Sequence, residues 1–117
     1  MGNMPYVNEQ IKAKYPNVIF DSTTIILENV DITPPLEPIL VGTIVYNGPS
    51  GNFQVVSSAG PSFITHAIGV ILDYKDGKAT VLIRGLVKGK LYYHNSTFND
   101  YREHPQKVFA NIIKMED

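Results

Sequence analysis

The stretch that most constrains this chain is "AIGVILDYKDGKATVLIRG", residues 67–85, in which two apolar runs flank an Asp76-Gly77 dipeptide. A type I′ hairpin turn needs positive φ at both central positions, and Asp-Gly adopts these angles at little cost. The stretch therefore predicts a β-hairpin whose two strands pair outward from this turn.

Counting outward from the turn predicts the register of the hairpin. The expected pairs are Lys75–Lys78, Tyr74–Ala79, Asp73–Thr80, Leu72–Val81, Ile71–Leu82, Val70–Ile83 and Gly69–Arg84. The face with Leu72 and Val70 is a core face, but the opposite face is also apolar where Ile71 meets Leu82. A sheet that is apolar on both sides is covered on both sides, and another subunit is one source of the second cover.

The expected subunit contact consists of Gly69, Ile71, Leu82 and Arg84. Gly69 leaves room for the aliphatic stem of Arg84, which lies opposite it in the predicted register. Two interpretations of Arg84 stay open. It is either an ordinary surface arginine or the partner of a carboxylate across a subunit contact, where arginine is enriched.

The remaining β-rich runs predict a small, mainly β domain. Residues 39–48, 51–60, 85–93 and 111–115 read as strands, and the first of these ends in an Asn47-Gly48 turn signal. A short helix is expected between Ser96 and Ala110, and residues 8–15 could form a turn or two of helix. This pattern favours a small antiparallel β-barrel, β-tulip-like domain or sandwich.

The N-terminal third predicts an arm separate from this domain. Pro34, Pro35 and Pro38 cannot donate backbone hydrogen bonds, so "TPPLEPIL" reads as a stiff connector. We therefore expect residues 1–33 to form an extended arm that a partner orders, and residues 34–117 to form the compact domain. Part of the apolar stretch from residue 18 onward could belong to the domain instead.

Composition and motifs provide no support for an enzyme. The 117-residue chain suits one domain, has no cysteine and carries a net charge of −1, which provides no electrostatic footprint for nucleic acid. His66, His94 and His104 match no metal-binding spacing and are expected in loops or at the surface. No cofactor, metal or membrane span is expected. Charged residues make up only 18%, which leaves room for protein interfaces.

Three strings in this order resemble the lambda-type phage head decoration family, also called capsid cement proteins. They are Gly42-Thr43-Ile44-Val45, Ala67-Ile68-Gly69-Val70-Ile71-Leu72 and Val81-Leu82-Ile83-Arg84-Gly85, followed by the ending "FANIIKMED". The resemblance covers residues 39–114 and implies a homotrimer on the outer surface of the expanded phage head, made in the host cytoplasm and bound to the major capsid protein. The "FNDYREHPQ" segment has no clear counterpart in the family.

The resemblance also implies that the N-terminal arm adds main-chain hydrogen bonds to a capsid strand. The arm residues expected to contact the capsid are Tyr6, Val7, Ile11, Tyr15, Val18, Ile19 and Phe20. An alternative function is a small β-barrel module that recognises nucleic acid or carbohydrate through "KGKLYY" and loop aromatics such as Phe63 and Phe98. An enzyme fragment or regulatory subunit is a third hypothesis.

Overall fold

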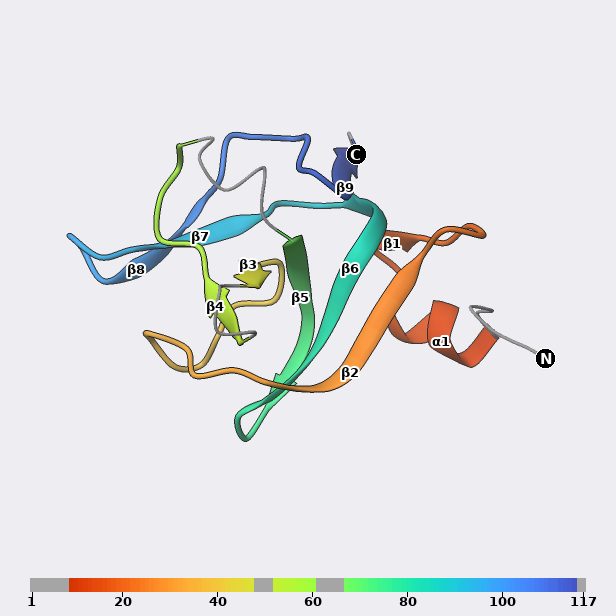
Figure 1. Ribbon diagram of the computed structural model, residues 1–117, viewed down its shortest axis with the longest axis horizontal. Coiled ribbons are helices and arrows are strands. Elements are labelled where there is room, and N and C mark those ends of the chain that lie inside the picture. Colours follow the sequence, from red (N-terminus) through yellow and green to blue (C-terminus); the bar gives the residue numbers. More distant parts are fainter. Residues whose placement is uncertain (1–8, 48–51, 61–66, 116–117) are drawn as a thin grey trace.

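The chain forms a mainly β domain with an open sheet, as a computed structural model shows (Figure 1). The structure describes residues 9–47, 52–60 and 67–115, without the side chains of residues 9–11 and 67. The elements among these residues are α1 (Glu9–Lys14), β1 (Val18–Ile19), β2 (Ile25–Asp31), β3 (Ile44–Asn47), β4 (Phe53–Val55), β5 (Ala67–Lys75), β6 (Lys78–Lys88), β7 (Tyr92–Asn95), β8 (Asp100–Glu103) and β9 (Ile112–Met115).

The long strand β6 organises the sheet. Its first half lies between β5 and β2, because Leu82 pairs with residues of both strands. Its second half lies between β1 and β9, which pair with Leu86 from opposite sides. Among the strands of the described residues, all pairings are antiparallel except that of β6 with β9. The sheet continues from β5 through β3 to β4, and no described strand pairs with the far edge of β4, so it does not close into a barrel.

The central hairpin forms at the predicted turn. Asp76 and Gly77 have φ values of 53° and 81°, as a type I′ turn requires. The pairs Lys75–Lys78, Tyr74–Ala79 and Asp73–Thr80 also have the predicted register. Beyond them a β-bulge at Leu72 shifts the register by one residue, so that Ile71 pairs with Val81 and Val70 pairs with Leu82.

The bulge corrects the expected subunit contact. Ile71 and Leu82 do not face each other but belong to different hydrophobic clusters, and neither is exposed to solvent. Gly69 is buried against Val81, since a Cβ atom built at this glycine would lie 2.5 Å from Val81 Cγ1. Of the four residues predicted for this contact only Arg84 is exposed. The predicted register failed because a turn aligns only the nearest pairs, whereas an extra residue further along reverses the faces.

The chain itself covers both sides of the central part of the sheet. One cluster contains Ile44, Val70 and Leu82, covered by residues from both ends of the chain. The other contains Val45, Ile71 and Val81, and part of its cover comes from the segment after β2. The covering side chains are Tyr15, Val18, Phe20, Phe109 and Ile112 for the first cluster, and Ile32 and Ile39 for the second.

The described part of residues 1–33 therefore belongs to the domain and is not a separate arm. β1 and β2 extend the sheet along one edge of β6, and β2 pairs with β6 from Ile25 to Asp31. The β-branched residues of this segment are used for sheet pairing and burial within the same chain. The helical turn that residues 8–15 could form is present as α1.

The helix predicted between Ser96 and Ala110 is wrong, because β7 and β8 form a hairpin there. The Asn95 side chain accepts a hydrogen bond from the Phe98 backbone N–H at 3.0 Å, and Asn99 adopts a positive φ of 52°. Asparagine tolerates both features well, which favours a turn over a helix. The final strand predicted within residues 111–115 is confirmed as β9.

Candidate functional site

One face at the end of the sheet carries an exposed row of aliphatic side chains. Ile19 pairs with Leu86, Leu86 with Ile113, and Ile113 with Val108, so all four lie on the same face. Val108 is 61% exposed and Ile113 is 42% exposed, while the other two are half-buried. We call these four residues the apolar row. Their neighbours Phe109 and Ile112 point inward and are buried.

A groove of about 330 Å³ runs beside the apolar row. Its lining includes Leu86, Val108 and Ile113, together with the two oppositely charged residues Arg84 and Asp21. Arg84 is exposed and forms no ion pair with any described residue. The groove therefore combines an apolar wall with one cation and one anion that do not neutralise each other within the chain.

Asp21 is held in place by the turn between β1 and β2. Its Oδ1 atom accepts hydrogen bonds from the backbone N–H of Thr23 at 2.8 Å and from the Thr23 hydroxyl at 2.7 Å. These bonds lower the pKa of the Asp21 carboxyl, so it is ionised at neutral pH. The Oδ2 atom of Asp21 accepts no hydrogen bond from the described residues.

A second groove of about 330 Å³ also borders Arg84. It lies where β5 separates from β6, and the Asn111 side-chain amide bridges this split by donating to the carbonyl oxygens of Ile68 and Ile83. Its walls include Ile25, Leu27 and Phe53. The Oδ1 atoms of Asn47 and Asn111 are buried and lack a hydrogen-bond partner among the described residues. Arg84 and Asn111 thus border both grooves.

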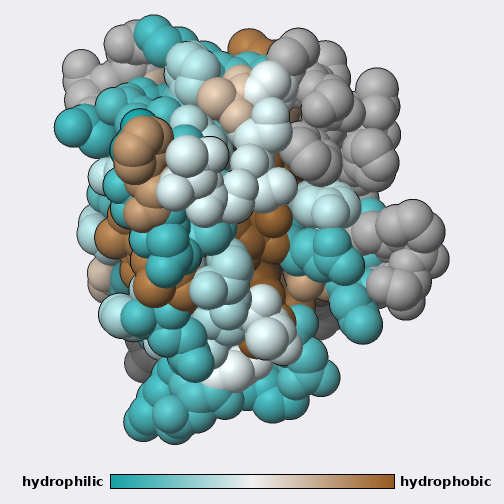
Figure 2. Space-filling view, turned by 90° about the vertical axis from the view of Figure 1, so that its left-hand side faces the viewer, coloured by the Kyte–Doolittle hydropathy of each residue, from teal (hydrophilic) through white to brown (hydrophobic). Residues whose placement is uncertain are grey.

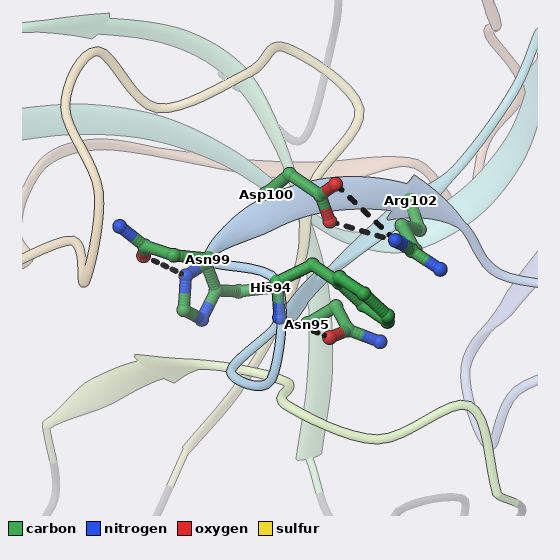
Figure 3. Close-up of polar contacts among 6 residues, drawn as sticks. His94, Asn95, Asn99, Asp100 and Arg102 are labelled. Carbon is green, nitrogen blue, oxygen red and sulfur yellow. Dashed lines mark hydrogen bonds and ion pairs between the residues drawn. The ribbon is translucent and has the colours of Figure 1, made fainter.

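The β7–β8 hairpin projects from the opposite end of the molecule and has an ordered tip (Figures 1 and 3). His94 Nε2 lies 2.9 Å from Asn99 Oδ1, and Asp100 accepts two hydrogen bonds from the Arg102 guanidinium (Figure 3). Arg102 stacks over the ring of Phe98, which is 64% exposed. The tip therefore presents an aromatic ring whose position is fixed by side-chain contacts.

A larger cleft of about 640 Å³ has a mixed lining. Ile32, Phe53 and Val55 form apolar parts of its wall, while Gln54 and His94 contribute polar groups. On the side of the molecule from which the hairpin projects, hydrophobic residues reach the surface in a recess between polar ones (Figure 2). No three metal-ligating side chains gather in the described part of the chain.

The expectation that the histidines are in loops or at the surface is wrong for His94, whereas His104 lies in the loop after β8, although it is buried. His94 and His104 are 6% and 3% exposed, and His94 lies in β7. Burial lowers the pKa of His104, which packs edge-on against Tyr93 and Phe109. Its Nδ1 accepts a hydrogen bond from the Gln106 backbone N–H. His66 lies outside the described residues.

The residues predicted to contact a capsid fall into three groups by their place in the structure. Tyr6 and Val7 lie outside the described residues, and only the backbone of Ile11 is described, within α1. Tyr15, Val18 and Phe20 pack into the hydrophobic core, so they are not available to a partner in this fold. Ile19 alone remains on an outer face, as the first member of the apolar row.

Sequence reasoning missed Asp21, Leu86, Val108 and Ile113. The alternation in "NIIKM" indicated that Ile112 and Ile113 lie on opposite faces, but not which face is covered. No local sequence pattern marked Asp21 or Val108 as site residues. They line the same groove as Arg84 only because distant strands meet in the folded chain.

Comparisons with protein-family models, with curated proteins and with solved structures found no match to this chain. In the described part of the chain, no helix has the length and apolar character needed to span a membrane.

Proposed function

We propose that this chain is a phage capsid decoration protein, which binds the outer surface of the expanded head as a trimer and stabilises it. The observation that carries the proposal is the apolar row beside Arg84 and Asp21, on a sheet whose central strands the chain itself encloses. Exposed aliphatic side chains flanked by unpaired charges are features of protein-contact surfaces.

The strings that resemble the decoration family support this proposal by their position. Ile44 and Val45 begin β3, residues 67–72 lie in β5, and residues 81–85 lie in β6. These three strands are neighbours in the sheet, in the order β6, β5 and β3. The resemblance therefore coincides with the structural centre of the domain and not with scattered loops.

The capsid contact proposed here is shorter than the arm that the sequence predicted. Tyr15, Val18 and Phe20 serve the core, so we propose that the segment up to Ile11, with Tyr6 and Val7, engages the major capsid protein. Three such segments on one trimer would bind with high avidity even if each contact is weak.

Binding to heads that lack the protein tests the proposed function directly. We expect the chain to co-sediment with expanded heads, to occupy three-fold positions in cryo-EM maps and to raise the temperature at which the heads rupture. Replacing residues 2–8 with a Gly-Ser segment of equal length should lower occupancy at least about ten-fold through lost avidity. A control variant, Lys12→Ala, should bind as the wild type does. Failure of the wild-type chain to bind expanded heads at saturating concentration would contradict the proposal.

The mixed cleft favours the alternative, a module that binds carbohydrate or nucleic acid. Its volume of about 640 Å³ and its combination of Phe53 with Gln54 and His94 would suit a polar ligand with one apolar face. Salt-dependent binding of single-stranded DNA, or sugar binding that is lost in Phe53→Ala, would support this alternative instead.

A further inference from the structure

We infer that the apolar row and the adjoining groove form a self-association surface, in which Arg84 of one copy pairs with Asp21 of the next. The inference rests on the proposed function and specifies how the copies would contact one another. It replaces the contact around Ile71 and Leu82, whose side chains are enclosed within the single chain.

The apolar row supplies the surface that association would remove from water. Four aliphatic side chains from β1, β6, β9 and the segment before β9 lie in line across the sheet. The two most exposed members, Val108 and Ile113, are directly opposite each other. Met115, two residues after Ile113 on β9, is 37% exposed and extends the apolar surface.

The charges in the groove indicate what kind of partner covers it. Arg84 can donate two parallel hydrogen bonds to a carboxylate, and Asp21 has its Oδ2 atom open to such a donor. A partner of one sign would satisfy only one of these two residues and leave the other buried without a counter-ion, which is costly. Other copies of this chain carry both signs in the same groove, and in a ring the two neighbours of each copy satisfy its Arg84 and its Asp21.

The geometry of a ring allows this pairing to repeat. In copies arranged around a three-fold axis, Arg84 of each would meet Asp21 of its neighbour, giving one equivalent pair per contact. The hydrogen bonds from Thr23 hold the carboxylate of Asp21 in position in the single chain. Less side-chain freedom is therefore lost when the pair forms.

Sedimentation equilibrium on the full chain tests the inference through charge variants. We expect Arg84→Glu to weaken self-association at least about ten-fold, because it places two carboxylates together. Asp21→Asn should weaken it by a smaller factor while keeping the Oδ1 acceptor for Thr23. The double variant Arg84→Glu with Asp21→Lys should restore association, and Lys90→Glu, an exposed change outside the groove, should leave it unchanged.

The apolar row has its own test, which does not depend on charge. Val108→Ser should weaken association while leaving the far-ultraviolet circular dichroism unchanged, since this side chain is 61% exposed. A wild-type chain that stays monomeric at its highest soluble concentration would overturn the inference. So would trimers that form equally well with Arg84→Glu.

Head binding separates this inference from the proposed function. Trimers that depend on Arg84 and Asp21 but never bind expanded heads would overturn the decoration function and leave the self-association surface intact. Heads that bind trimers of the Arg84→Glu variant at wild-type occupancy would overturn only the self-association surface.

Discussion

The two halves of β6 belong to one continuous strand and have different surroundings. In the first half, Val81 and Leu82 point to opposite sides, and both are fully buried by the rest of the chain. In the second half, Val87 is 3% exposed on the inner side, whereas Leu86 lies half-exposed in the apolar row. Gly85 separates the halves with a φ of 146°. An apolar strand can thus be enclosed at one end and remain available to a partner at the other.

The difference arises from the partners of each half. The first half pairs with β2 on one side and with β5 on the other, and the contact with β5 closes a short loop because only a two-residue turn separates the strands. The second half has no such local partner. The second half pairs with β1 and β9, which come from the two ends of the chain. Segments that return from far along the chain decide which face of the second half is covered. Four predictions test this contrast.

Deleting residues 1–20 should have the largest effect. The deletion removes β1 together with Tyr15, Val18 and Phe20, which cover the hydrophobic cluster beneath the second half of β6. We expect loss of the cooperative thermal transition measured by circular dichroism, because several buried side chains disappear at once. Deleting residues 1–8 is the matched control and should leave the transition in place. A cooperative fold in the longer deletion would restore the idea of a detachable arm.

Leu82→Ala and Leu86→Ala compare the same substitution in the two halves. Leu82 is fully buried, so its truncation should lower the free energy of unfolding by about 2–5 kcal/mol. Leu86 lies half-exposed, and its truncation should cost less than about 1 kcal/mol. Urea titration measures both. Equal losses would show that the second half is enclosed to the same degree as the first.

Gly69→Ala tests the close packing that accompanies the bulge in the first half. The added Cβ would lie 2.5 Å from Val81 Cγ1 and 3.3 Å from the Leu82 carbonyl oxygen. We expect a loss of about 1–3 kcal/mol from overpacking. Gly60→Ala, where the nearest atom is the Ser58 hydroxyl at 3.4 Å, should change stability by less than about 0.5 kcal/mol. A neutral Gly69→Ala variant would contradict the observed register.

The smallest expected effect is on the pH dependence of stability, through His104 in the core beneath the second half of β6. Burial lowers the pKa of His104 in the folded chain, so the unfolded chain binds a proton at higher pH. The stability contribution of neutral His104 is therefore complete above the ordinary value of about 6.5 and is lost as the pH falls below it. Urea midpoints measured from about pH 8 to about pH 5 should fall less steeply in His104→Gln than in the wild type. Identical slopes would exclude this histidine as a source of acid sensitivity.

Strand runs and local turns were predictable because their signals are local. Residues 67–85 contain both strands and the turn between them, and Asp76-Gly77 specified the first three pairs. The β-rich runs that became β3, β4 and β9 also had sufficient apolar and β-branched residues to be recognised. The β7–β8 hairpin was missed because Ser96 and the acidic residues after it are equally typical of a helix start.

Local sequence specifies the β class, the central turn and the registers closest to it, since these depend on neighbouring residues and their preferred φ angles. Three features arise only in the folded chain: the bulge at Leu72, the docking of residues 15–33, and the groove that Arg84 and Asp21 share. Each of these depends on segments far apart in the chain that compete to cover the same apolar faces. The free energy of that burial is settled by the whole fold and not by any one stretch.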